Sequence, residues 1–217
     1  MMSRLLLLLL FSFSLQGFTQ SSVTPKSWIG GGLDYHISKW VKLNVGYQYR
    51  TELNEDYDSY SFSDIGTSFR ITKKISIKPS FRISHFSKIN NDKNRASLDV
   101  GYKFGKKKSD WSFGVRARGQ YQFLVNQVER DIVIRQKASV GYKLNKKISF
   151  KTSVELFEEI FRLSDVRIKL GANYKVKKRI GVKLFYAYER ELLRKNIDKT
   201  HIIGLMLNVK LKRKKND

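Results

Sequence analysis

The stretch GYKLNKKISFK, residues 141–151, decides how the rest of the chain is understood. Its four lysines would suit binding to nucleic acid. Apolar side chains nevertheless occupy every second position on both sides of Asn145–Lys147. Two runs that alternate with a period of two, joined by a short polar turn, predict a β-hairpin. We therefore expect the lysines at the turn and on one face of the two strands.

The same hairpin pattern recurs along the chain. Related segments begin at Asp34, Ser68, Gly101, Gly141 and Asn173, and a last, incomplete copy begins at Asn208. Longer polar segments, such as TELNEDYDS at 51–59, separate one hairpin from the next. Short turns at one end of the strands and longer loops at the other are typical of outer-membrane β-barrels, in which the short turns are periplasmic.

Strand length favours a membrane barrel over a soluble sandwich. The alternating runs are about ten residues long, as a tilted strand needs to cross a bilayer, whereas strands of soluble sheets are usually five or six residues long. Eleven strands are expected, at 28–37, 40–51, 61–71, 75–86, 95–104, 111–123, 132–144, 148–158, 164–176, 180–190 and 201–211. Aromatic residues near both strand ends match the two interfaces of a bilayer. The predicted fold is all-β, a transmembrane antiparallel up-and-down barrel of 10 to 12 strands.

The strand count leaves the closure of the barrel open. Antiparallel bacterial barrels normally close with an even number of strands. Residues 20–27 could add a stunted strand and give twelve, although Pro25 cannot donate a hydrogen bond to a sheet. Alternatively, the first segment, with glycines at 30–32, could pack inside a barrel of ten strands.

The N-terminus and the cysteine content indicate the compartment. Residues 1–19 carry Arg4, an apolar run from Leu5 to Leu15 and then small and polar residues, as a cleaved signal peptide does. Residues 20–217 would then form a single outer-membrane barrel domain. The chain has no cysteine, which excludes a lipoprotein anchor and disulfides. With 43 Lys and Arg against 19 Asp and Glu the formal charge is +24, but an exported protein rarely meets nucleic acid.

If the apolar face of each strand contacts lipid, the polar face lines the lumen. The basic residues expected there are Lys42, Arg50, Arg70, Lys78, Arg82, Arg95, Lys103, Arg116, Arg118, Arg135, Lys137, Lys151, Arg167, Lys169 and Lys183. Their acidic partners are expected to be Asp64, Asp99, Glu155 and Glu189. Such an excess would attract small anionic solutes, as rings of Arg and Lys do in anion pores. The alternative is that these side chains fill the lumen of a non-conducting barrel that is structural or binds through its loops.

Other candidate sites are weaker. The turn lysines at 73, 74, 106, 107, 146, 147, 177 and 178 would lie at the headgroups of outer-membrane lipids. The acidic residues of loop 51–60 do not have the spacing of a calcium site, so no metal or other cofactor is expected. His36, His85 and His201 show no catalytic spacing. A lipid-modifying enzyme of the outer membrane remains a second alternative, and no catalytic residue is assigned.

Several residues give the chain a resemblance to a known family. These are Trp28, Arg50 at the end of the second strand, the turn Tyr142–Lys147 and HIIGL at 201–205. With them the chain resembles a family of Bacteroidetes outer-membrane barrels called domain of unknown function 2490. The resemblance implies location in the outer membrane of a Gram-negative bacterium and no known activity. The last strand departs from the usual barrel assembly signal, because it ends in Leu211 and a basic tail instead of an aromatic residue.

Overall fold

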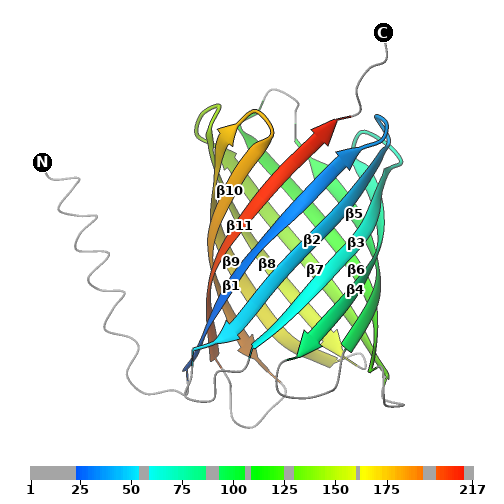
Figure 1. The fold of residues 1–217 in the computed structure, drawn as a ribbon, viewed down its shortest axis with the longest axis vertical. Coiled ribbons are helices and arrows are strands. Elements are labelled where there is room, and N and C mark those ends of the chain that lie inside the picture. Colours follow the sequence, from blue (N-terminus) through cyan, green and yellow to red (C-terminus); the bar gives the residue numbers. More distant parts are fainter. Residues whose placement is uncertain are drawn as a thin grey trace, which may run out of the picture.

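The structure, a computed structural model, describes residues 23–53, 59–86, 93–105, 109–124, 130–159, 162–192 and 199–212, so the predicted signal peptide at 1–19 lies outside the described residues. The strands are β1 Val23–His36, β2 Val41–Glu52, β3 Ser59–Arg70, β4 Ile75–Phe86, β5 Lys93–Phe104, β6 Trp111–Leu124, β7 Arg130–Lys143, β8 Ile148–Glu159, β9 Arg162–Lys177, β10 Ile180–Glu191 and β11 Lys199–Lys212. Together they form one closed barrel (Figure 1). In this part of the chain, no helix has the length and apolar character that a membrane span needs.

The predicted fold class is confirmed. From β1 to β11 each strand pairs antiparallel with the next one along the chain, as an up-and-down barrel requires. Apart from the start of β1, the strand bounds differ from the predicted ones by no more than two residues. The period-two pattern locates strands well because successive side chains in a barrel wall point alternately outward and into the lumen.

The closure of the barrel differs from both even-numbered alternatives. β1 and β11 lie side by side and pair in parallel, from Val23 opposite Lys199 to His36 opposite Lys212 (Figure 1). Residues 23–27 form no separate strand but continue β1, and the glycines at 30–32 lie in the barrel wall. A parallel closure lets an odd number of strands form a barrel with no free edge. The N-terminal end of β1 and the C-terminal end of β11 consequently lie at opposite ends of the barrel (Figure 1).

A shared side-chain contact explains the repeated turn motif. In the turn at 144–147, Asn145 Oδ1 accepts hydrogen bonds from the backbone N–H groups of Lys147 and Ile148, both at 2.8 Å. The hydroxyls of Ser38 and Thr72 accept the corresponding pairs of hydrogen bonds in their turns, at 3.0 and 3.1 Å. Short polar side chains that accept backbone N–H groups favour tight turns. The lysines that follow them are free to point into solvent.

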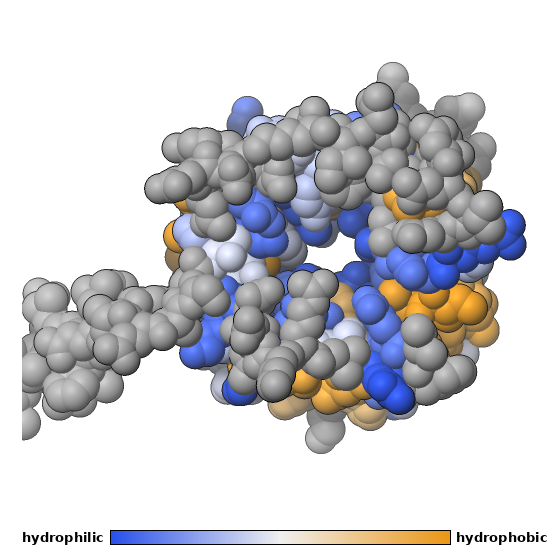
Figure 2. Space-filling model, turned by 90° about the horizontal axis from the view of Figure 1, so that it is seen from below, coloured by the Kyte–Doolittle hydropathy of each residue, from blue (hydrophilic) through white to orange (hydrophobic). Residues whose placement is uncertain are grey.

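The two faces of the wall differ in polarity. Large apolar side chains at alternate positions are exposed on the outside, among them Ile29 at 58%, Ile65 at 53% and Leu205 at 46%. Viewed along the barrel from the end where β1 begins, hydrophobic residues lie on the outside and hydrophilic residues border a central opening (Figure 2). This distribution is the reverse of a soluble β-sandwich, in which the apolar face is buried.

A small apolar core lies inside the barrel beside the parallel closure. Trp28, Phe185, Ala187 and Ile202 are buried there, each no more than 5% exposed, and Met206 packs against them. The rings of Trp28 and Phe185 meet edge to face, with centroids 6.0 Å apart. These residues come from β1, β10 and β11, so the core joins the first strand to the last two.

Candidate functional site

The barrel interior holds a cavity of about 460 Å³ with a basic wall. Ten basic residues line it: Arg50, Arg82, Arg95, Arg116, Arg118, Arg135, Lys137, Arg167, Lys169 and Lys183. Four carboxylates share the described part of the wall: Glu155, Glu159, Asp165 and Glu189. The central opening in Figure 2 is bordered by hydrophilic residues.

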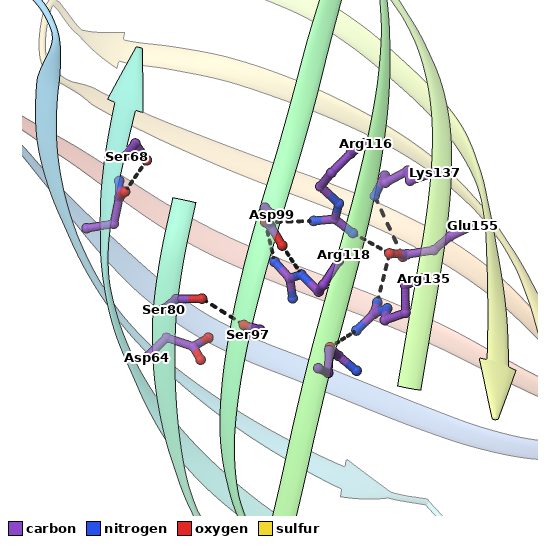
Figure 3. Close-up of polar contacts among 12 residues, drawn as sticks. Asp64, Ser68, Ser80, Ser97, Asp99, Arg116, Arg118, Arg135, Lys137 and Glu155 are labelled. Carbon is purple, nitrogen blue, oxygen red and sulfur yellow. Dashed lines mark hydrogen bonds and ion pairs between the residues drawn. The ribbon is translucent and has the colours of Figure 1, made fainter. Parts of the chain in front are cut away.

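Contacts that skip a strand show that the charged face points inward. Arg116 on β6 forms an ion pair with Glu155 on β8, although β7 lies between these strands (Figure 3). In a curved wall, side chains of β6 and β8 can approach each other only on the concave side. The side chains that alternate with them therefore point outward.

Glu155 is the centre of one ion-pair network. Its side chain is only 5% exposed, and Arg135 Nη2 lies 2.9 Å from Oε1, which also pairs with Arg116. Lys137 Nζ lies 3.9 Å from Oε2 (Figure 3). Arg167 Nη1 lies at the same distance from this oxygen. One carboxylate thus faces four cations from β6, β7 and β9. A buried carboxylate needs such partners, because an unpaired charge is costly away from water.

The other predicted carboxylates each hold an arginine. Arg82 makes two contacts with Asp64, both 2.8 Å, in the fork geometry typical of guanidinium and carboxylate groups. Asp99 pairs with Arg118, whose Nη2 lies 2.7 Å from Oδ2, and Arg116 Nη1 lies 3.6 Å from the same oxygen (Figure 3).

On the next part of the wall, Arg167 Nε donates to Glu189 at 2.6 Å. All four carboxylates predicted for the lumen therefore bind arginines that were predicted with them.

Two arginines of the wall form no ion pair within the described chain. Arg95 binds the amide oxygen of Gln122 through Nε and Nη2, at 3.0 and 2.6 Å. Arg50 donates to the Tyr60 hydroxyl at 2.7 Å and lies over the face of Trp28, 3.6 Å from the ring centroid. Their partners are neutral, so no carboxylate of the described residues neutralises their charges.

The remaining predicted lumen residues lie toward the short turns. Lys42 pairs with Asp34 at 3.0 Å, and with Arg70 and Lys103 it lines a smaller hollow of about 180 Å³. Lys78 and Lys151 are absent from the lining of the central cavity. The predicted set is therefore divided between the central cavity and the end of the barrel that carries the short turns.

Sequence reasoning missed the apolar and amide residues of the interior. Trp28, Phe157 and Phe185 line the cavity together with Gln120 and Gln122. Rings here carry cations on their faces: Lys169 Nζ lies 3.2 Å from the Phe185 centroid and Arg135 lies 4.3 Å from that of Phe157. The sequence did carry a signal that Phe185 points into the lumen, because Phe185 alternates in phase with Lys183 and Glu189 along the same strand.

The weaker candidates stay separate from the cavity. His36 lies at the short-turn end of β1, while His201 near the start of β11 contacts Tyr186 at 2.6 Å. Loop residues 54–58 and turn residues 106–108 are outside the described residues. Among the residues that are described, no group of three or more His, Asp or Glu is placed to hold a metal ion.

Comparison with known proteins adds a family. Among solved structures, the chain is similar to one described as "KdgM porin", with 13% identity, a TM-score of 0.46 and coverage of 69% of this chain and 84% of that one. It is also similar to "NanC porin structure in rhombohedral crystal form", with 14% identity, a TM-score of 0.44 and coverage of 79% and 90%. A comparison with curated proteins finds no match. The model of the family "Protein of unknown function (DUF2490)" matches residues 11–200, and the chain therefore belongs to that family.

Proposed function

We propose that the protein is an outer-membrane barrel that acts as a narrow, anion-preferring pore. The observation that carries this proposal is the excess of basic over acidic side chains around the central cavity. In a water-filled passage with low-dielectric walls, such an excess raises the local concentration of anions and repels cations. Small anionic solutes are then the species that pass, and nucleic acid is not a partner.

The outer face supports the membrane location. Exposed Ile, Leu, Val and Phe side chains recur on all sides of the barrel, an arrangement that monomeric soluble proteins avoid. Closure removes every free strand edge, so the barrel satisfies its backbone hydrogen bonds in lipid without a partner. We infer a monomer in the outer membrane of a Gram-negative bacterium, with lipid as its surroundings.

Conductance in planar bilayers tests the pore. The refolded protein is inserted into a bilayer that separates two KCl solutions of different concentration. It should carry current, and the sign of the reversal potential should be the one expected for chloride. Replacing Arg116 and Arg118 by Ser should shift this potential toward that of potassium. The double change removes two positive charges and leaves Glu155 and Asp99 without their closest partners, so the lumen becomes less basic.

A matched control removes the same charge outside the cavity. Lys73 and Lys74 lie in the short turn at 71–74 and do not line the cavity. The Lys73→Ser/Lys74→Ser variant should keep the reversal potential of the original protein. Current that prefers cations in the unmodified protein would contradict the proposal.

A second candidate is a filled, non-conducting barrel. The ion pairs of Glu155 with Arg116 and Arg135, together with the core around Trp28, occupy part of the interior. If this packing closes the passage, the same bilayer experiment shows no current in protein that has refolded, as judged by its heat-dependent migration in gel electrophoresis. The barrel would then act as a structural protein or bind through its loops.

A further inference from the structure

The cations of the interior fall into two classes with different partners. Arg82, Arg118 and Arg167 each contact a carboxylate at 2.8 Å or less. Their charge is largely compensated, and they connect neighbouring strands. Arg50 and Lys169 have no carboxylate partner within the described residues, and each lies over an aromatic face instead. An aromatic ring attracts a cation but does not cancel its charge. These two groups therefore retain a capacity to bind an anion.

The uncompensated cations converge on Trp28. Arg50 lies 3.6 Å and Lys169 Nζ 5.6 Å from the centroid of its ring. The nearby Arg167, at 5.3 Å, is engaged by Glu189. Arg50 of β2 and Lys169 of β9, which are far apart in the sequence, thus meet at the Trp28 ring of β1 on the cavity wall.

This position is short of hydrogen-bond acceptors. Trp28 is 5% exposed, and among the described residues neither its Nε1–H nor the buried Nε of Arg50 has a hydrogen-bond partner. Elsewhere in the cavity wall the buried Nε groups of Arg116 and Arg135 also find no acceptor within the described part of the chain. Buried donors without acceptors are uncommon in proteins and indicate that a ligand or water supplies the missing oxygen atoms. Because the donors around Trp28 lie beside positively charged groups, an acceptor with negative charge would satisfy them better than a neutral one.

The apolar core beside Trp28 strengthens this preference. Phe185, Ala187 and Ile202 back the indole ring and exclude water from that side. Electrostatic attraction and charge-assisted hydrogen bonds are stronger in such low-dielectric surroundings than in bulk water.

We propose that Trp28, Arg50 and Lys169 form a binding site for an oxyanion, a carboxylate or phosphate group carried by a small solute. The anion accepts hydrogen bonds from Arg50 and Lys169 and moves these two side chains away from the aromatic rings. It also accepts a hydrogen bond from Trp28 Nε1–H. The site lies in the proposed pore. It depends on the proposed function only in that the solute would reach it through the pore. Its chemistry favours oxyanions over chloride, because several donors need separate acceptor oxygens.

Tryptophan fluorescence tests binding without requiring conduction. The chain has three tryptophans, and Trp40 and Trp111 are 53% and 51% exposed, away from the cavity. In the Trp40→Phe/Trp111→Phe variant, Trp28 is the only source of tryptophan fluorescence. Titration with sodium phosphate should give a saturable change as Arg50 leaves the ring, whereas sodium chloride at equal ionic strength should give none. Dihexanoylphosphatidic acid in a parallel titration separates a lipid headgroup from a free solute.

Charge-neutral variants test the assignment. Arg50→Gln in the same background should weaken phosphate binding by roughly tenfold or more, the effect of losing one charge-assisted contact. Lys169→Gln provides a second variant should Arg50→Gln fail to refold. Lys146→Gln, in the short turn at 144–147, removes one charge outside the cavity and should leave the affinity unchanged.

Three results would overturn this site. The first is a fluorescence response to chloride as large as that to phosphate. The second is an unchanged affinity for phosphate in both Arg50→Gln and Lys169→Gln. The third is a response to dihexanoylphosphatidic acid but not to phosphate. Because binding and current are measured separately, a conducting barrel without the fluorescence response would refute the site and leave the pore intact. A phosphate response in a barrel that carries no current would refute the pore and support the site.

Discussion

At the scale of single residues, neutral side chains determine which cations of the interior keep their charge available. Carboxylates hold the arginines of β4, β6 and β9, whereas the rings of Trp28 and Phe185 hold Arg50 and Lys169. Aromatic residues on an inward face therefore serve two purposes. They fill space beside the parallel closure, and they position cations without neutralising them.

The packing of Phe185 depends on a glycine opposite it. A Cβ atom built on Gly204 would lie 2.0 Å from the Phe185 ring, a distance that forces the ring to move. We expect Gly204→Ala to destabilise the barrel by about 1–3 kcal/mol, the usual cost of overpacking. Urea-induced unfolding followed by tryptophan fluorescence measures the change.

A glycine on the other face provides the control. A Cβ atom on Gly119 would meet no atom within 4 Å, so Gly119→Ala should leave the unfolding midpoint close to that of the original protein. Equal midpoints for the two variants would show that Phe185 does not pack as tightly as the structure indicates.

At the scale of elements, the pairing of β1 with β11 is the most unusual feature. All other neighbours are consecutive strands that run antiparallel, and the connection within each hairpin brings them together. The closing pair is joined by no hairpin, and its register is instead matched by the contact of Trp28 on β1 with Phe185 on β10, opposite Gly204 of β11. The interior core thereby specifies how the barrel closes.

Cysteine cross-linking tests this closure in a chain that has no cysteine of its own. Ile29 and Leu205 are direct partners on the outer face, so Ile29→Cys/Leu205→Cys should form a disulfide on mild oxidation. Gel mobility under denaturing, non-reducing conditions detects the large loop that the bond closes.

The control shifts one cysteine by two residues on the same face. Leu207 lies about 7 Å further along β11 than Leu205, so Ile29→Cys/Leu207→Cys should cross-link poorly. More efficient cross-linking in this pair would mean that β1 and β11 pair in another register or direction.

At the scale of the whole molecule, the odd strand number separates the two ends of the described chain. β1 begins at the barrel end that carries the longer connections, and β11 finishes at the end with the short turns (Figure 1). If the short turns face the periplasm, the start of β1 faces the exterior of the cell.

Labelling of intact cells tests this orientation. Leu53 is 52% exposed and follows β2. The Leu53→Cys variant should react with a membrane-impermeant maleimide added to whole cells. Lys146→Cys, in the short turn at 144–147, should react only after the cells are lysed. Labelling of Lys146→Cys alone in intact cells would reverse the proposed orientation.

The local pattern determined the strands, because every residue of a barrel wall faces one of two solvents. Segments such as 141–151 alternate so regularly that their turns, strand bounds and inward lysines could be predicted from the sequence. The same alternation identified Arg116, Arg118 and Glu155 as members of one face. It could not predict that they would meet across β7, since such contacts depend on the curvature of the closed wall.

Only the tertiary structure decided how the barrel closes and which cations stay uncompensated. The pairing of β1 with β11 joins residues far apart in the chain, and no turn chemistry encodes it. Likewise, Trp28 and Arg50 come together through the pairing of β1 with β2, while Lys169 of β9 reaches Trp28 past β10 and β11 on the concave side of the wall. The sequence by itself determined which side chains face inward. Contacts that skip a strand, such as Arg116 with Glu155 and Lys169 with Trp28, were set by the curvature and closure of the wall, which are properties of the whole sheet.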